Sequence, residues 1–380
     1  MKLSCSKDLL VHGIGIVGKA VTGRSTQPIL ECILLETNSD GLVLTGNDLE
    51  LGIESRTIAA DVDEGGKVAL NARIFSDIVR KMPGDKVEIE CMGNFVTMLR
   101  GGGAEFRILG SDGDEFPGLP EMDGGDVNDR FEITAAEISG MIKQVLFSVS
   151  TDESKPALTG VLFESKEGKL RLVSLDTLRV SVREADIDNK ELSVYAIIPG
   201  KVLGEITKVL GTSDKNIVTI QFMKNLVLFE TDEARIISRL IDGKFIDYER
   251  LFATEATTYL TLHSKFLEDG LERASLISRE ARKNPVRLTA EERDGAFALT
   301  VESKAETGTF IEEIGQEAAL SLDGQGIKIS FNPKFLLDVL KVVNDGSICL
   351  KFTTPISPCI ITGTEDESYR YVIMPLREYM

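Results

Sequence analysis

Residues 332–343, NPKFLLDVLKVV, predict a helix with an asparagine cap, a proline at its first position and apolar residues at helical spacing. Two similar stretches are NARIFSDIVRKM at 71–82 and PGKVLGEITKVL at 199–210. In each, an acidic residue lies four positions after one basic residue and three before another. These sets are Arg73, Asp77 and Arg80; Lys201, Glu205 and Lys208; and Lys334, Asp338 and Lys341. The basic residues of a set lie about 10 Å apart on one helical face.

The resemblance between these stretches extends along the whole chain. An offset of 128 residues aligns Pro28 with Pro156, residues 33–36 with 161–164, Asp48 with Asp176, and Arg73 with Lys201. A fainter third copy has Pro285 and Lys334 at the corresponding positions. Residues 119–130 and 251–258 are polar and aperiodic, which predicts linkers. We therefore expect three domains, near 1–125, 126–253 and 254–380.

Each third of the chain predicts a strand, a helix and three strands, and then the same series again. In the first third, the expected helices are residues 7–20 and 71–82, and ECILLE at 31–36 is one expected strand. Short turns between consecutive strands require antiparallel neighbours. The predicted fold class is α+β, with two helices per unit packed on antiparallel sheet.

The composition excludes several classes of function. A formal net charge of −18 argues against ordinary nucleic-acid binding through a basic domain. The five cysteines form no C-x-x-C pair, so we expect reduced thiols in a cytoplasmic protein. Two histidines leave little material for a metal site or a Ser-His-Asp triad. We expect no catalytic residue, metal, cofactor, signal peptide or membrane-spanning segment.

The repeated charges have two interpretations. Each could be a solvated helical face, whose ion pairs between residues four apart add a few tenths of a kcal/mol and were inherited by duplication. Alternatively, an acidic protein that keeps one surplus positive charge on each of three helices faces a polyanion on one side only.

Two other motifs are ambiguous. Gly13-Ile-Gly-Ile-Val-Gly18 matches a dinucleotide-binding fingerprint, with Glu36 near the place of a ribose-binding acid. The residues before Gly13 predict a helix rather than a strand, so this enzyme interpretation is the minor alternative. The apolar stretch at 371–377, YVIMPLR, is either a last core strand or the wall of a peptide groove.

Several motifs, in this order, resemble the bacterial sliding clamps, the beta subunits of DNA polymerase III. The motifs are MKLSCSKDLL at 1–10, RSTQPIL at 24–30, LTGNDLEL at 44–51, LTGVLFE at 158–164, LIDGKFIDYERL at 240–251 and YVIMPLR at 371–377. The resemblance covers the whole chain. It implies a clamp fold of three similar domains, with two chains closing head to tail into a six-domain ring around duplex DNA, and a non-catalytic processivity factor.

The resemblance also implies roles for particular residues. Arg24 and Arg73 would lie near DNA, with Lys201 and Lys334 added by repeat equivalence and Arg80, Lys208 and Lys341 by the shared helical face. Phe106 and Ile108 would meet Leu276 and Ile277 at the dimer interface. A groove for partner peptides would be formed by Leu158, Leu175, Thr177, Arg179, Val180, Ile246, Arg250, Leu251, Val372, Met374, Pro375 and Leu376.

The implied partners are duplex DNA of any sequence, the polymerase III alpha subunit, the clamp loader, and other polymerases and repair proteins that carry short linear motifs. The chain departs from the family pattern at 175–180, LDTLRV, and at Ile246, where a proline is usual, so the preferred peptide is expected to differ. Residues 378–380 extend past the usual end, and Asp152 replaces the basic residue equivalent to Arg24. A monomeric repeat scaffold without a DNA role is the remaining alternative.

Overall fold

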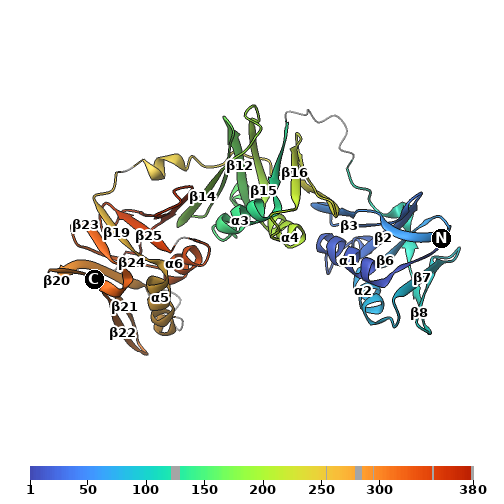
Figure 1. Ribbon diagram of the computed structural model, residues 1–380, viewed down its shortest axis with the longest axis horizontal. Helices are drawn as coiled ribbons and strands as arrows, with labels where there is room; N and C mark the ends of the chain where they lie inside the picture. The colour runs from blue at the N-terminus through green and yellow to red at the C-terminus, as the bar shows by residue number, and fades with distance from the viewer. Residues whose placement is uncertain (121–128, 254, 279–284, 294, 345, 378–380) are drawn as a thin grey trace. The chain divides into compact units, whose positions relative to one another are not determined.

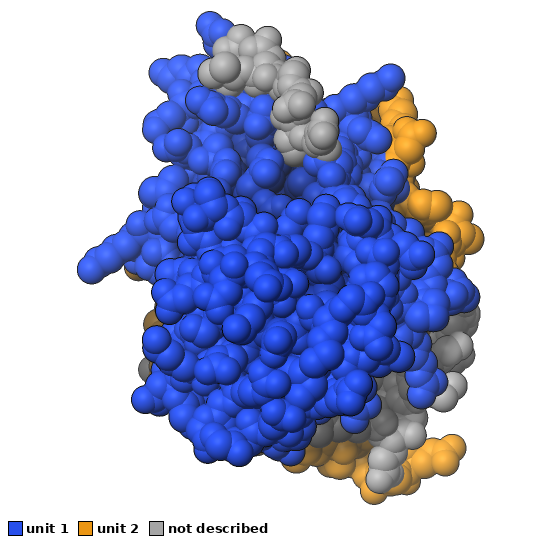
Figure 2. Space-filling model, turned by 90° about the vertical axis from the view of Figure 1, so that its right-hand side faces the viewer, with its two compact units in different colours: residues 1–139, 187–241 blue, residues 140–186, 242–380 orange. Residues whose placement is uncertain are grey.

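The structure, a computed structural model, describes residues 1–120, 129–253, 255–278, 285–293, 295–344 and 346–377. The chain forms two compact units, which Figure 2 shows in blue and orange. Unit 1 comprises residues 1–139 and 187–241, and unit 2 comprises residues 140–186 and 242–380. The predicted middle domain contributes residues to both units, and the predicted domain boundaries stay a prediction. The extension at 378–380 lies outside the described residues.

Unit 1 is built on a long antiparallel sheet, in the order β11-β16-β17-β18-β4-β3-β5-β1-β7-β8-β9, with β2 and β10 joined through β6. Its strands are β1 (Lys2–Ser6), β2 (Cys32–Asn38), β3 (Gly41–Asn47), β4 (Leu51–Ser55), β5 (Ile58–Glu64), β6 (Lys67–Asn71), β7 (Lys86–Cys91), β8 (Val96–Gly101), β9 (Ala104–Leu109), β10 (Ser111–Asp112), β11 (Arg130–Thr134), β15 (Val194–Pro199), β16 (Ile217–Phe222), β17 (Leu226–Glu230) and β18 (Ala234–Arg239). The β4–β18 pairing joins segments that are far apart in the sequence.

The helices of unit 1 are α1 (Lys7–Val17), α2 (Ala72–Lys81) and α4 (Gly200–Leu210), and α3 (Ala135–Leu146) begins in it. Helices α1 and α2 lie side by side against the sheet (Figure 1). The side chain of Asn71 accepts a hydrogen bond from the Ile74 amide at 3.2 Å, which confirms the predicted cap of α2. The buried side chains Phe75 and Val79 lie one turn apart on its inner face.

The glycine motif lies within and just after α1 rather than in a strand-to-helix turn. Gly13 is buried because α1 packs closely on the sheet, where an added Cβ would lie 2.7 Å from Ile58 Cδ1. The helix ends at Val17 and continues as a short 3-10 turn, η1 (Gly18–Ala20). This arrangement offers no glycine loop to a pyrophosphate, which removes the basis of the dinucleotide interpretation.

Unit 2 contains sheets in the orders β12-β13-β14-β27-β26-β25-β19-β23 and β22-β21-β20-β24. Its strands are β12 (Gly160–Lys166), β13 (Lys169–Leu175), β14 (Arg179–Asp186), β19 (Thr258–His263), β20 (Val286–Arg293), β21 (Ala296–Ala305), β22 (Gly308–Ile314), β23 (Ser321–Gly324), β24 (Ile327–Phe331), β25 (Ser347–Phe352), β26 (Cys359–Gly363) and β27 (Tyr369–Ile373). Helices α5 (Ser264–Ser278) and α6 (Pro333–Leu340) contact each other over a core that includes Leu271, Phe331 and Leu336.

Helix α6 is shorter than the predicted span of 332–343. Asn332 caps it by accepting from the Lys334 amide at 3.0 Å, and Pro333 is its first residue, as predicted. It ends at Leu340, and its last turn is tighter, since the Val342 amide donates to the carbonyl of Val339 three residues before it. The predicted fold class, with helices packed on antiparallel sheet, is confirmed.

Candidate nucleic-acid and peptide interfaces

Helices α2 and α4 of unit 1 expose the basic residues that the sequence singled out. On α2, Arg73, Arg80 and Asp77 are exposed, and no ion pair within the described residues joins Asp77 to either arginine. On α4, Lys201 and Lys208 are exposed, and Lys208 Nζ lies 2.7 Å from Glu205 Oε1. An ion pair therefore forms on α4 between residues three apart rather than the predicted four, and it offsets one of the two positive charges.

The acidic residue of α6 has a different partner from the one the sequence suggested. Asp338 Oδ2 lies 2.6 Å from Arg179 Nη1, on strand β14. Lys334 and Lys341 are exposed, and neither makes an ion pair with Asp338 within the described residues. Asp338 therefore pairs across to β14, and Lys334 and Lys341 are both left without an ion pair among the described residues.

Arg24 is exposed in the irregular segment between η1 and η2 (Pro28–Glu31). Its repeat partner in the alignment, Asp152, lies in a turn where the Ser154 hydroxyl and amide both donate to Asp152 Oδ1. These hydrogen bonds hold the pKa of Asp152 below its ordinary value. Asp152 therefore carries a negative charge where the first repeat has the basic residue Arg24.

Strands β14 and β27 bring most of the predicted groove residues together. Val180 is paired with Val372, and both are buried. The Asp176 carboxylate accepts from the Leu178 and Arg179 amides at 2.7 and 3.1 Å, which fixes the turn between β13 and β14. The adjoining predicted residues are Leu175, which is buried, Thr177, which is exposed, and Met374, Pro375 and Leu376, which are half-buried.

Sequence analysis missed Leu178, which lies in the same turn. Its side chain is 39% exposed, and its carbonyl accepts from the Met374 amide at 2.8 Å. The sequence carries no clear signal for it, because single exposed leucines are common on protein surfaces, and only the pairing with β27 shows that it adjoins the predicted groove residues.

Arg179 lies behind this surface rather than on it. Its guanidinium lies 4.4 Å from the Phe335 ring centroid and 5.4 Å from that of Phe147. It also contacts the Asp176 and Asp338 carboxylates and donates to the Phe147 carbonyl. With its side chain only 10% exposed, Arg179 ties β14 to α6 and positions the neighbouring residues.

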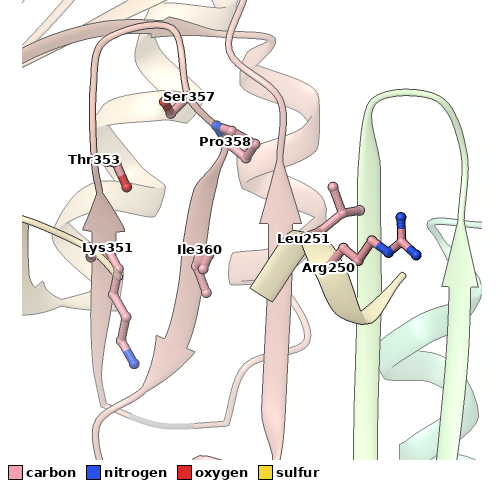
Figure 3. Close-up of a pocket in the computed structure, with 8 residues that line it drawn as sticks. Arg250, Leu251, Lys351, Thr353, Ser357, Pro358 and Ile360 are labelled. Carbon is pink, nitrogen blue, oxygen red and sulfur yellow. The ribbon is translucent and has the colours of Figure 1, made fainter. Parts of the chain in front are cut away.

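The other predicted groove residues lie on separate elements of unit 2. Leu158 is buried in η5 (Pro156–Thr159), and Ile246 is exposed. Arg250 and Leu251 lie in η6 (Glu249–Phe252) and line a hollow of about 120 Å³ together with Lys351, Thr353, Pro358 and Ile360 (Figure 3). The structure therefore places Arg250 and Leu251 beside β25 and β26.

A polar network anchors the segment that leads into η6. Arg171 Nη1 lies 2.9 Å from the Tyr248 hydroxyl and 3.1 Å from Glu164 Oε1, and its Nε lies 2.6 Å from Glu184 Oε1. The Tyr248 hydroxyl also donates to Glu164. Burial, together with this bond, raises the pKa of Tyr248.

The residues predicted at the dimer interface lie on edges and exposed faces. Strand β9 is the last strand of its sheet, with Phe106 39% exposed and Ile108 half-buried. On α5, Leu276 is 63% exposed and Ile277 is half-buried. Strand β22, which contacts α5, is also a sheet edge. Exposed apolar residues beside unpaired strand edges are typical of association surfaces.

Within the described residues, no three His, Cys, Asp or Glu side chains are grouped as metal ligands would be. Of the helices in the described part of the chain, none combines the length and apolar character needed to cross a bilayer.

Models of the three domains of one protein family match the chain in order. The N-terminal domain of the DNA polymerase III beta subunit matches residues 1–120, the central domain 132–247 and the C-terminal domain 249–377. The chain belongs to the DNA polymerase III beta subunit family. The beta sliding clamp of Bacillus subtilis (strain 168) is similar to it over all of both chains, with 34% identity.

Solved structures of family members have the same fold. The crystal structure of the Bacillus subtilis DNA polymerase sliding clamp is 34% identical, with a TM-score of 0.94 and complete coverage of both chains. That of the Thermotoga maritima DNA polymerase III beta subunit is 26% identical, with a TM-score of 0.89 and the same coverage. The chain therefore has the three-domain clamp fold and is a sliding clamp, a non-catalytic processivity factor that acts with DNA and a DNA polymerase.

Proposed function

We propose that two copies of this chain close head to tail into a ring that encircles duplex DNA of any sequence and tethers the replicative polymerase to it. Within each chain, the proposed domains are residues 1–125, 126–253 and 254–380. One observation carries the proposal: a chain with a net charge of −18 exposes two basic residues on each of three equivalent helices. The proposed place of action is the cytoplasm.

The basic helices would face the enclosed DNA. Arg73, Arg80 and Arg24, the α4 pair Lys201 and Lys208, and the α6 pair Lys334 and Lys341 are the proposed contacts. Enclosure retains DNA without tight binding, so a few contacts to phosphate are enough and sequence plays no part. Acidic surface elsewhere would disfavour DNA on the outside of the ring.

The ring would close by pairing strand edges. Phe106 and Ile108 on β9 would pack against Leu276 and Ile277 of the second copy. This contact would cover apolar side chains on both surfaces and satisfy the free backbone groups of β9. Two equivalent contacts of this kind would close the dimer.

Partner proteins would bind through short apolar peptides at the β14–β27 surface. Leu178, Met374, Pro375 and Leu376 provide partly exposed apolar side chains there, and methionine suits a surface that accepts several peptides. The proposed partners are the polymerase III alpha subunit, the clamp loader, and other polymerases and repair proteins.

The proposed dimer interface is tested with Phe106→Asp, which places a charge in the contact between the two chains. We expect light scattering to give the mass of one chain for this variant and of two chains for the unchanged protein. Primer extension with the cognate polymerase and clamp loader should give short products with the variant. Ile217→Asp charges a strand residue of 47% exposure and should leave both results unchanged. A stable Phe106→Asp dimer that supports long products contradicts the proposal.

A further inference from the structure

The β4–β18 junction of unit 1 repeats the backbone of the β14–β27 junction of unit 2. Asp48 Oδ1 accepts from the Glu50 and Leu51 amides at 3.0 and 2.8 Å, as Asp176 does in its own turn. The Arg239 amide donates to the Glu50 carbonyl at 2.9 Å, as Met374 does to Leu178 at 2.8 Å. Gly52 is paired with Ile237 just as Val180 is paired with Val372.

This register assigns each groove residue a counterpart in unit 1. Leu175, Thr177, Val180, Val372 and Met374 correspond to Asn47, Leu49, Gly52, Ile237 and Arg239. The five counterparts line one hollow of about 60 Å³, together with Leu226, Gly118 and Pro120. Unit 1 therefore contains the framework of a second groove, with the chain's own residues 118–120 in it.

Leu119 fills the space where a groove side chain would lie. Its side chain packs on the buried residues Leu226, Leu228 and Ile237. A Cβ on Gly52 would overlap Leu119 Cδ2, so the missing side chain of Gly52 makes room for Leu119. The buried Asn47 amide holds the segment by donating to the Pro117 and Gly118 carbonyls at 3.0 and 3.5 Å.

The corresponding segment of unit 2 follows another path. It also begins with a buried phenylalanine, Phe245 in place of Phe116. Three residues later it carries Tyr248 in place of Leu119, and the Tyr248 hydroxyl is bonded to Glu164 on β12 and Arg171 on β13. The anchor of this segment is therefore on β12 and β13, away from the turn that holds Leu178.

We propose that residues 117–120 are a built-in ligand that occupies a second copy of the peptide groove, so that each chain keeps a single groove for partners. The occupant is a short apolar segment, Pro-Gly-Leu-Pro, held by one leucine side chain and by two backbone carbonyls. The description of the β4–β18 hollow as a second peptide groove rests on the proposed function of the β14–β27 surface. The packing of Leu119 in that hollow is independent of the proposed function.

The test uses full-length protein and the synthetic peptide EFPGLP, residues 115–120, with photo-leucine in place of its leucine. In Leu119→Asp, the segment loses its apolar contact, and the peptide should then label β17 and β18 on irradiation. We expect labelling to rise at least about tenfold over the unchanged protein, because binding falls with the fraction of time that a site is open. The same peptide with Asp in place of leucine is the control.

Leu119→Ala provides a second route that introduces no charge. It removes the side chain that fills the hollow and leaves Gly52 unchanged, so labelling should rise as in Leu119→Asp, and this variant decides the matter if Leu119→Asp fails to fold. A folded variant with unchanged labelling, or equal labelling of the unchanged protein, overturns the proposal.

Binding of the purified polymerase alpha subunit is measured in parallel. Leu119→Asp should bind it as the unchanged protein does, because the β14–β27 surface is intact. If the alpha subunit binds neither protein, the proposed partner surface fails while the labelling result still decides the role of residues 117–120.

Discussion

The β4–β18 and β14–β27 junctions have one backbone and different side chains. Both have an aspartate turn, the same strand register and the same hydrogen bond across the junction. In unit 1, Asn47 and Gly52 accommodate Leu119. In unit 2, Leu175 and Val180 take their places, and Arg179, whose side chain is 10% exposed, lies behind them. The two junctions thus share a backbone frame, and the side chains at a few positions determine that residues 118–120 cover the one in unit 1.

Replacing Arg179 should have the largest effect on stability, because Arg179 ties the β14–β27 junction to α6. Arg179→Ala leaves Asp338 without its partner and removes the contacts with Phe335 and Phe147. We expect the free energy of unfolding to fall by about 3–4 kcal/mol, since breaking a largely buried ion pair leaves a charge uncompensated.

Chemical denaturation measures this difference. Arg250→Ala is the matched control, because that side chain is 87% exposed beside Asp247 and should contribute less than about 1 kcal/mol. If both variants lose the same small amount of unfolding free energy, Arg179 does not stabilise the β14–β27 junction.

Tyr248→Phe tests the hydrogen bonds that hold residues 245–248 of unit 2, which correspond to residues 116–119 of unit 1. Loss of the hydroxyl bonds to Glu164 and Arg171 should lower the free energy of unfolding by about 1–2 kcal/mol. The native pKa of Tyr248 is raised above its ordinary value of 10.0, so its contribution is complete below pH 10 and declines as the pH rises further.

Thermal unfolding between pH 8 and 11 measures the effect. The unchanged protein should lose stability above pH 10 more steeply than Tyr248→Phe. Parallel curves would show that this hydroxyl does not couple the segment to the network.

Charge reversal compares α6, whose acid is engaged by Arg179, with α4, whose acid offsets Lys208. Lys334→Glu/Lys341→Glu should weaken association with linear duplex more than Lys201→Glu/Lys208→Glu. The expected loss is about tenfold at low salt, and the slope of log affinity against log salt should fall by about 1–2. Fluorescence anisotropy measures both quantities, and equal losses on the two helices would contradict the idea that ion pairing weakens the contribution of α4.

Asn47→Leu gives the β4–β18 junction the residue type of its counterpart Leu175 at the β14–β27 junction. It removes the donors to the Pro117 and Gly118 carbonyls, and we expect a cost of about 1 kcal/mol. Hydrogen exchange at the Gly118 and Leu119 amides should accelerate, while exchange at the Leu178 amide stays unchanged. Unaltered exchange at Gly118 and Leu119 would show that the Asn47 side chain does not hold the segment.

The features that sequence analysis predicted correctly are local. The caps at Asn71 and Asn332 and the helical position of Gly13 follow from residue types at fixed spacing. The partner of Asp338 could not be predicted in this way, because Arg179 is distant in the sequence and spacing favoured Lys334 and Lys341. The seating of Leu119 was missed for the same reason, since it depends on a pairing between remote strands.

Retention on circular DNA tests the sliding clamp most directly. Protein loaded on a nicked duplex circle should remain bound through a high-salt wash and leave when the circle is cut, because closure of the ring holds it there. Release by salt from the intact circle, with no effect of the cut, would show ordinary electrostatic binding and contradict enclosure.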